Sequence, residues 1–404
     1  MIGIIGSGAA GMAAAVTAAR LGASVTVLER DKRAGRKLSA TGNGRCNITN
    51  MSASVNTYSS ASQSTLDEML GNLSPAQVRQ FFDSLGLPTR EEEEDRVYPR
   101  CNLAGAVVDA LRLAMGELGV VLKTECPVKS VKREKHGFGV ALASGEHLWF
   151  DKLIIAAGGA AAEKNGGTAD GVTFLRNLGH SIVPILPALS PLCTETELIR
   201  PLKGIRAACV ISAFAKNTLL RKELGEVQFA DFGISGIAAM QLSTSIAQHN
   251  EPITLSLDFF HEQDEQDLCD YLIKRRDAFP QRALPEWLAG LLHRRVAEML
   301  YKYRNLPLSL LSGELTDSQI RSLAASMKNF PLKCTGVKPL PFSQATAGGA
   351  KLTQFDSATM ESRLVPNLFA AGEVLDAVGD CGGFNLHWAW VTGITAGRAA
   401  ARCE

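Results

Sequence analysis

The feature that most constrains this fold is a glycine-rich turn between an apolar strand and a helix. Residues 3–11 read Gly-Ile-Ile-Gly-Ser-Gly-Ala-Ala-Gly, which contains the pattern Gly-x-Gly-x-x-Gly. An Ala-rich segment follows to Leu21, Gly22 ends it, and a second apolar stretch over 24–28 ends in Glu29. A strand, a helix and a second strand in this order predict a dinucleotide-binding βαβ unit.

Each glycine of this motif has its own expected task. Gly6 permits the tight turn, Gly8 lets the backbone approach a pyrophosphate, and Gly11 lets the helix pack closely on the sheet. The start of the helix offers free N–H groups and a partial positive charge to the phosphates. Glu29 stands where an acid accepts hydrogen bonds from a ribose 2′-OH, and it disfavours a 2′-phosphate. The sequence therefore predicts that FAD or NAD is bound rather than NADP.

The composition shows no dominant charge. Lys and Arg number 42 and Asp and Glu number 41, so the net charge of +1 gives no global attraction to nucleic acid or membrane. The nine cysteines contain no Cys-x-x-Cys, which argues against a zinc site, a disulfide scaffold or a dithiol reductase, and no metal is expected. No apolar run approaches the roughly 18 residues of a membrane span, and the first strand begins near Ile2. We therefore expect a cytoplasmic protein, and the sequence indicates no oligomeric state.

Two similar apolar strands, one before and one after a segment of different character, indicate one α/β domain with an insertion. Residues 152–155 lead into Gly158, and residues 367–371 lead into Gly372 and Glu373 before an Ala- and Gly-rich helix. Between them the pattern changes to short alternating strands and then to amphipathic helices. The predicted division is residues 1–186 and 341–404 for the α/β domain and 187–340 for the insertion, with strands over 187–261 and 331–340 and helices over 262–330.

Four motifs in this chain resemble the BaiN/aminoacetone-oxidase-type family of NAD(P)/FAD-dependent oxidoreductases. They are Thr-Gly-Asn-Gly-Arg-Cys-Asn-Ile-Thr-Asn at 41–50, Phe-Gly-Ile-Ser-Gly at 232–236, Ala-Gly-Gly at 347–349 and Gly-Gly-Phe-Asn-Leu-His-Trp-Ala at 382–389. The resemblance covers nearly the whole chain. It implies an α/β fold in which a split Rossmann-type FAD-binding domain carries an inserted β-barrel and a helical cap.

The resemblance also implies a set of cofactor-binding residues. Gly6, Gly8, Ala10 and Glu29 would hold the ADP half of FAD, and Val128 would touch the adenine. The full set is Gly6, Gly8, Ala9, Ala10, Gly11, Glu29, Arg36, Lys37, Gly42, Asn43, Gly44, Arg45, Cys46, Val128, Ala157, Gly158, Gly372, Glu373, Gly383, Phe384, Asn385 and Leu386.

Three residues of the motifs are candidates for chemistry. Arg45 would either neutralise reduced flavin or bind an anionic substrate, or else form a structural ion pair. His387 stands where this family is expected to carry Gln, and it would act either as a proton donor with a pKa near neutrality or as a packing histidine. Cys46 is either a redox thiol or a small residue packed beside the flavin.

The resemblance implies an FAD-dependent oxidoreductase that takes a hydride from NAD(P)H and passes it through flavin N5 to an activated C=C bond of a small molecule. The substrate would be an enone or a uracil ring, including a uridine of ribosomal RNA. NAD(P)H would bind transiently, because the chain holds no second dinucleotide fingerprint. Two rivals stay open, namely an aminoacetone-type amine oxidase that uses O₂ and a non-catalytic FAD-stabilised binding protein.

One segment of the predicted helical cap is strongly basic, although the net charge of the whole chain is only +1. Residues 274–304 carry eight Lys and Arg against three Asp and Glu, a net charge of +5. Such a segment is either the solvated face of amphipathic helices or an electrostatic contact surface for RNA.

Overall fold

The computed structural model describes residues 1–402 and divides the chain into two compact units. The first unit comprises residues 1–186 and 343–404, and the second comprises residues 187–342. The chain returns to the first unit two residues later than the predicted boundary at 340.

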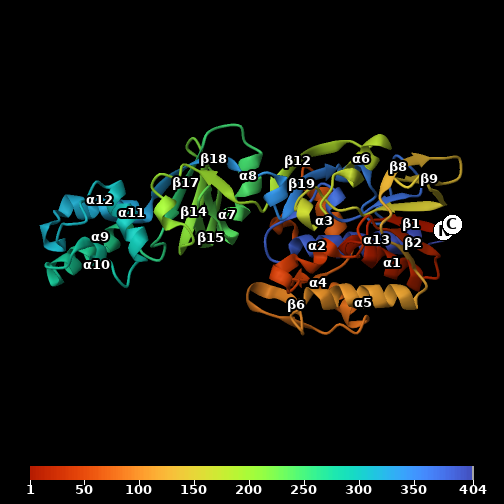
Figure 1. The fold of residues 1–404 in the computed structure, drawn as a ribbon, viewed down its shortest axis with the longest axis horizontal. Coiled ribbons are helices and arrows are strands. Elements are labelled where there is room, and N and C mark those ends of the chain that lie inside the picture. Colours follow the sequence, from red (N-terminus) through yellow and green to blue (C-terminus); the bar gives the residue numbers. More distant parts are fainter. Residues whose placement is uncertain (403–404) are drawn as a thin grey trace. The chain divides into compact units, whose positions relative to one another are not determined.

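A parallel five-stranded sheet forms the centre of the first unit (Figure 1). Its strands follow the order β20 (Leu368–Ala370), β11 (Lys152–Ile155), β1 (Ile2–Ile5), β2 (Val25–Leu28) and β7 (Val121–Lys123). All four strand pairs are parallel. Short apolar strands of this kind suit a sheet that is covered on both faces. The βαβ unit predicted from the first 29 residues is confirmed.

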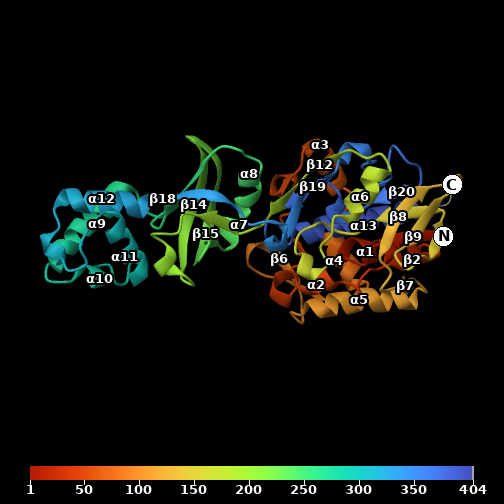
Figure 2. The same cartoon turned by 45° about the horizontal axis from the view of Figure 1, so that its top comes forward.

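Two helices that are distant in sequence pack tightly beside this sheet, α1 (Ala9–Arg20) and α13 (Phe384–Ala400). A Cβ atom at Gly393 or Gly397 of α13 would overlap the backbone of Ala10 or Ala14. Glycine at these two positions therefore allows the N-terminal and C-terminal parts of the split domain to share one core. Helix α5 (Ala104–Glu117) also packs on α1 (Figure 2).

Smaller sheets and helices complete the first unit. One antiparallel sheet consists of β8 (Val128–Arg133), β9 (Phe138–Leu142) and β10 (His147–Phe150), and another of β3 (Thr49–Asn50), β5 (Thr89–Glu91) and β6 (Arg96–Pro99). Two-stranded pairs form between β4 (Tyr58–Ser59) and β21 (Val378–Gly379) and between β12 (Ile182–Ala188) and β19 (Ala345–Ala350). The remaining helices are α2 (Arg36–Ser39), α3 (Gln63–Leu70), α4 (Pro75–Asp83) and α6 (Asp170–Asn177).

The second unit contains a closed six-stranded barrel and a group of helices, as the resemblance implied. The barrel order is β13 (Leu192–Thr194), β16 (Gly233–Ser235), β15 (Thr218–Ala230), β14 (Arg206–Ala215), β17 (Ile253–Asp258) and β18 (Phe330–Val337). Two short helices, α7 (Ile237–Gln241) and α8 (Ser243–Ala247), pack against it. The helical cap consists of α9 (Glu265–Ala278), α10 (Leu284–Trp287), α11 (Arg294–Tyr303) and α12 (Asp317–Lys328).

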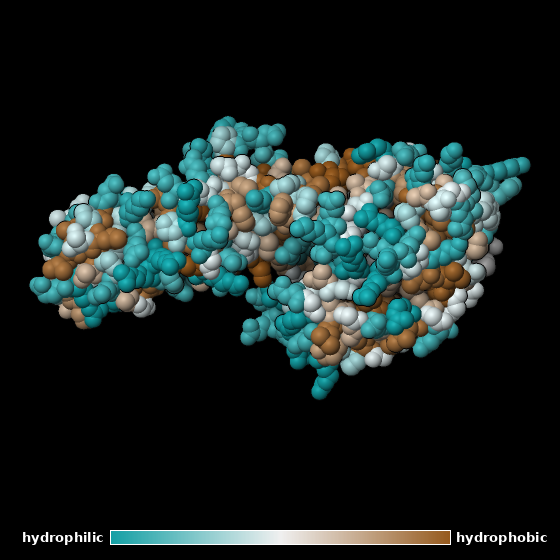
Figure 3. All heavy atoms as spheres, viewed as in Figure 1, coloured by the Kyte–Doolittle hydropathy of each residue, from teal (hydrophilic) through white to brown (hydrophobic). Residues whose placement is uncertain are grey.

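The surface is largely polar, with scattered apolar side chains on the face seen in Figure 3. Within residues 1–402, no helix has the length and apolar character that a membrane crossing requires.

Candidate functional site

The first unit contains a cavity of about 220 Å³ at the carboxyl ends of its parallel strands. Ile5 and Leu28 end β1 and β2, and Ala156 and Ala371 directly follow β11 and β20; all four line the cavity. In open parallel sheets, this edge is where nucleotides bind. The central strands therefore place the glycine-rich turn at a cavity of the expected kind.

The glycines of that turn have different surroundings. Gly6 has a φ of +100°, and a Cβ there would lie 2.5 Å from the Ala156 carbonyl oxygen. A Cβ at Gly11 would overlap the Gly6 carbonyl oxygen, so this glycine allows α1 to approach the turn. At Gly8, by contrast, a Cβ would meet no atom within 4 Å. Gly6 and Gly11 are thus required by the protein's own packing, whereas the space at Gly8 is available to a ligand.

Glu29 is held at the cavity wall by three hydrogen bonds. One carboxylate oxygen accepts from the Ser7 backbone N–H at 2.9 Å and from the Ser7 hydroxyl at 2.6 Å. The other accepts from the Asp31 N–H at 2.8 Å. All three donors are neutral groups, so none of them offsets the formal charge of Glu29. This geometry fits a dinucleotide with a free 2′-OH.

The charged residues that line the cavity are mostly paired with one another. Three cations and four carboxylates give a net charge of −1, so the wall offers no excess of positive side chains to a diphosphate. The pairs are Arg30 with Asp170 at 3.6 Å, Arg36 with Asp31 at 3.3 Å and Lys37 with Glu373 at 2.7 Å. The remaining charge is that of Glu29. Backbone N–H groups and helix N-termini are therefore the groups available for phosphate oxygens.

The first turn of α13 forms another part of the wall. Gly383, with a φ of +100°, precedes the helix, and Asn385 fastens the preceding turn through both its amide atoms to the backbone of Gly379 at 2.9 and 2.7 Å. Gly372 is held by the Thr392 hydroxyl, which accepts from its N–H at 2.9 Å, and by the Trp388 indole N–H, which donates to its carbonyl at 3.1 Å. The helix N-terminus and the Gly372 turn are thereby fixed together. The Ala- and Gly-rich helix predicted after Glu373 is α13, which begins at Phe384.

Most of the predicted cofactor-binding residues meet at this cavity. Those that line it are Gly6, Gly8, Ala9, Ala10, Glu29, Arg36, Lys37, Val128, Ala157, Gly158, Gly372, Glu373, Asn385 and Leu386. The predicted residues that do not line it are Gly11, Gly42, Asn43, Gly44, Arg45, Cys46, Gly383, Phe384 and His387. Of the loop residues 41–50, only Thr41 lines the cavity.

Arg45 is part of an internal network. Its guanidinium donates to Glu92 at 2.6 Å and to the Asn102 side-chain oxygen at 2.8 Å, and it lies over the ring of Tyr98 at 4.1 Å from the centroid. Glu92 also pairs with Arg90 at 2.6 Å. The structure thus shows the structural ion pair, and it gives no support to Arg45 as a catalytic residue.

His387 and Cys46 are both buried. Burial lowers the pKa of His387 to about 4, and its Nδ1 shares a 2.8 Å hydrogen bond with the Thr49 hydroxyl. Burial therefore opposes a proton donor with a pKa near neutrality and favours the packing role for His387. Burial likewise raises the pKa of the Cys46 thiol to about 12, which opposes a redox-active thiolate.

One loop that lines the cavity was not among the predicted site residues. Asn165, Gly166, Gly167 and Thr168 line it. Arg36 donates to the Lys164 carbonyl at 2.6 Å and so links this loop to α2. The run Asn-Gly-Gly-Thr soon after a buried strand was a usable signal, since glycines there permit close approach to a ligand.

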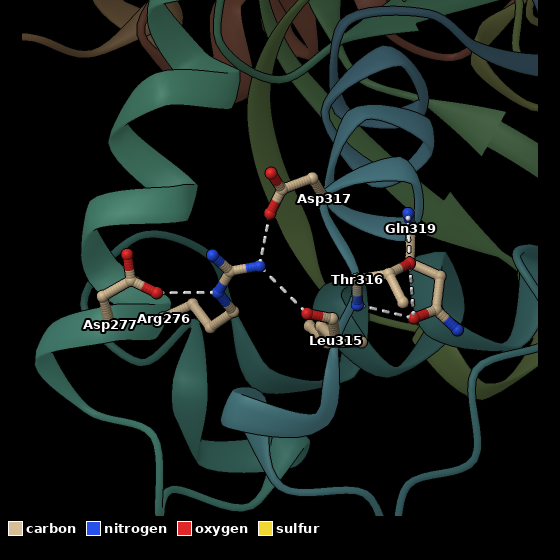
Figure 4. Close-up of polar contacts among 6 residues, drawn as sticks. All are labelled: Arg276, Asp277, Leu315, Thr316, Asp317 and Gln319. Atoms are coloured by element: carbon tan, nitrogen blue, oxygen red, sulfur yellow. Dashed lines mark hydrogen bonds and ion pairs between the residues drawn. The ribbon is translucent and has the colours of Figure 1, made fainter.

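Several arginines of the basic segment 274–304 form hydrogen bonds within the helical cap. Arg276 contacts Asp277 at 2.8 Å, Asp317 at 2.6 Å and the Leu315 carbonyl at 3.0 Å, beside the capping box of Thr316 and Gln319 (Figure 4). Other cations of the segment are engaged in the same way: Arg275 donates to the carbonyls of Trp287 and Ala289, and Arg304 donates to Ser326. These arginines hold the cap together, so fewer of their N–H donors are available to a polyanion.

Comparisons with known proteins show the family and the fold of this chain. The family model described as HI0933-like protein Rossmann domain matches residues 1–399. The chain is 32% identical to a 3-dehydro-bile acid delta(4,6)-reductase of Clostridium scindens, over 99% of this chain and 98% of that protein. It is 29% identical to a ribosomal RNA dihydrouridine synthase of Escherichia coli, over 96% and 94%. A 3-ketosteroid delta1-dehydrogenase from Sterolibacterium denitrificans shares the fold with a TM-score of 0.53 at 14% identity, over 99% of each chain.

Proposed function

This chain belongs to the HI0933-like Rossmann family of FAD-dependent oxidoreductases, and on that premise we propose that it is a reductase of activated C=C bonds that uses NAD(P)H as its electron donor. FAD, when bound, supplies hydride chemistry that no side chain provides. The observation that carries the proposal is the cavity itself, where a Gly8 backbone facing open space, a fixed Glu29 and the first turn of α13 line one wall.

The residues that would hold FAD follow from the fit of the cavity. Glu29 would accept from a ribose hydroxyl, and the N–H groups at the start of α1 would meet the diphosphate. Lys37 and Glu373 would lie beside the cofactor as an ion pair, because both line the cavity and their charged atoms are 2.7 Å apart. This pair joins the two sequence halves of the split domain.

For the substrate, we propose a small enone-type molecule. The bile acid reductase and the dihydrouridine synthase are both named for the saturation of a conjugated double bond, and the similarity to the first extends over nearly all of both chains. The intramolecular bonds of Arg275, Arg276 and Arg304 argue for a small molecule over RNA, since RNA binding needs side-chain cations that can reach and neutralise phosphates.

Anaerobic rapid mixing of the FAD-loaded protein with NADH and with NADPH tests the donor. We expect the yellow absorbance of oxidised flavin to disappear with at least one nucleotide and to return slowly in air. Addition of a conjugated ketone steroid to the reduced protein is then expected to restore the colour without O₂. A uridine-containing RNA serves as the competing substrate in the same assay.

The outcomes separate the rival functions. Failure of both nucleotides to bleach the flavin, together with rapid bleaching by an amine and fast return in air, would replace the reductase with an amine oxidase. A flavin that resists nucleotides, amines and a chemical reductant would indicate a binding protein. Reoxidation by RNA and not by the enone would refute the proposed substrate while leaving the reductase reaction in place.

A further inference from the structure

A second, smaller cavity of the first unit lies where α13 ends. Its volume is about 60 Å³, and none of its lining residues lines the larger cavity. The lining residues are Asn72, Ala358, Thr359, Thr395, Arg398, Ala399 and Arg402. The positions 395, 398, 399 and 402 follow helical spacing, so four of the seven residues share one face of α13 and its C-terminal continuation.

Thr395 lacks the hydrogen bond that comparable threonines in this protein form. The Thr392 hydroxyl donates to the Trp388 carbonyl at 2.7 Å, and the Thr17 hydroxyl donates to the Ala13 carbonyl at 2.8 Å, in each case four residues back. The Thr395 hydroxyl is buried, its residue is only 4% exposed, and the oxygen has no partner among residues 1–402. A buried hydroxyl without a partner is costly, which points to a ligand or water in the cavity that it lines.

The two arginines give the cavity a positive wall. Both are exposed, and no acidic side chain within the described residues forms an ion pair with Arg398 or Arg402. Asp356, two residues before the lining residue Ala358, pairs with Arg363 at 3.1 Å. The carbonyl ends of α13 contribute about half a negative charge, and the Lys152 ammonium donates to the Arg402 carbonyl at 2.8 Å. The two positive charges of Arg398 and Arg402 are therefore larger than the partial negative charge at the end of α13.

We propose that this cavity binds one small tetrahedral oxyanion of the inorganic phosphate type. The Thr395 hydroxyl and the guanidinium groups of Arg398 and Arg402 are its donors. One water needs about 10–15 Å³ of cavity volume, so this cavity has room for roughly four waters. A tetrahedral oxyanion with four oxygen atoms matches that volume. A whole nucleotide is too large. The site is independent of the proposed reductase reaction, since none of its residues lines the larger cavity.

Binding of inorganic phosphate to the FAD-loaded protein tests the proposal. Thermal unfolding is measured with increasing potassium phosphate and with potassium chloride at equal ionic strength, and the affinity is measured by calorimetry. We expect phosphate, and not chloride, to raise Tm with saturation, as for a ligand that binds only the folded state. R398Q and R402Q are expected to weaken phosphate binding at least tenfold, and T395V several-fold.

The matched control is R112Q, which removes an exposed helical arginine elsewhere in the same unit and is expected to leave phosphate binding unchanged. Equal Tm shifts in phosphate and chloride, or full phosphate binding by R398Q, would overturn the proposal. A T395V variant that is more stable than the parent and shows no phosphate effect would identify a water site instead. R398Q alters only an exposed side chain, so it tests the site even if T395V fails to fold. Displacement of phosphate by AMP would overturn the assignment of a free anion.

Discussion

The different surroundings of Gly6 and Gly8 predict that the same substitution to alanine acts on different properties at the two positions. At Gly6, alanine must adopt a φ of +100° and place its Cβ 2.5 Å from the Ala156 carbonyl oxygen. Left-handed backbone costs a non-glycine residue roughly 1–2 kcal/mol. The overlap adds to this, so we expect G6A to lower the free energy of unfolding of the FAD-free protein by about 2 kcal/mol or more.

At Gly8, two small terms oppose each other. The backbone is extended, with a φ of −77° and a ψ of −168°, so alanine fits without strain and restricts the unfolded chain, a gain of about 0.4–1 kcal/mol. Alanine is the poorer residue at a helix N-cap, where it costs about 0.5–1 kcal/mol relative to glycine. The free energy of unfolding of FAD-free G8A should therefore stay close to that of the parent. The new methyl group occupies the space of the diphosphate, and we expect FAD affinity to fall at least tenfold, or about 1.4 kcal/mol.

Two assays separate these effects. Urea unfolding of the FAD-free proteins measures stability, and titration of FAD followed by its fluorescence measures affinity. The reasoning would be refuted if G8A bound FAD as tightly as the parent. It would also be refuted if G8A were destabilised as strongly as G6A, because the space beside Gly8 would then be needed by the protein itself.

Three further predictions concern buried and paired side chains. His387 has a folded pKa of about 4, below its unfolded value of about 6.5. The unfolded state therefore binds more protons, and the free energy of unfolding falls as the pH drops through this range, by about 3 kcal/mol at pH 4. In H387Q this pH-dependent component should be absent from urea unfolding curves. Iodoacetamide at pH 8 should modify the exposed Cys101 and spare Cys46 until urea is added, and early labelling of Cys46 by mass spectrometry would contradict its burial. R276Q should destabilise the helical cap by about 1 kcal/mol and speed hydrogen exchange over 312–317, and unchanged exchange there would show that the Arg276 contacts are not structural.

Local patterns in the sequence were enough to predict the framework. The strand, glycine turn and helix of residues 2–29 follow from short-range spacing, and each glycine role depends on neighbours within the motif or on a strand beside it. The six-stranded barrel and the helical cap were implied by the resemblance of dispersed motifs, since short strands alone do not indicate closure. The start of α13 has no clear signal in the sequence, because most of its residues are buried and no polar stripe marks the helix.

The two candidate catalytic residues have hydrogen-bond partners that are distant in the sequence. Arg45 looked available because its partners, Glu92 and Asn102, lie 47 and 57 residues away in the sequence. His387 is removed from chemistry by burial against Thr49, which is 338 residues distant. Burial and ion pairing decide whether a polar side chain is reactive, and neither can be read from the motif in which that side chain stands.

The charge balance of the larger cavity favours backbone atoms as the groups that would bind the phosphates of the proposed dinucleotide. Each cation on its wall is matched by a carboxylate, and Glu29 remains without a cation. If side-chain cations bound the diphosphate, they would have to leave these carboxylates, and the carboxylates would then repel the ligand. Backbone N–H groups at the starts of α1 and α13 carry no such cost, because a helix N-terminus has N–H groups without partners within the helix. The same unmatched acid repels a 2′-phosphate, so one charge arrangement accounts for both how the cavity would hold a dinucleotide and which dinucleotides it would reject.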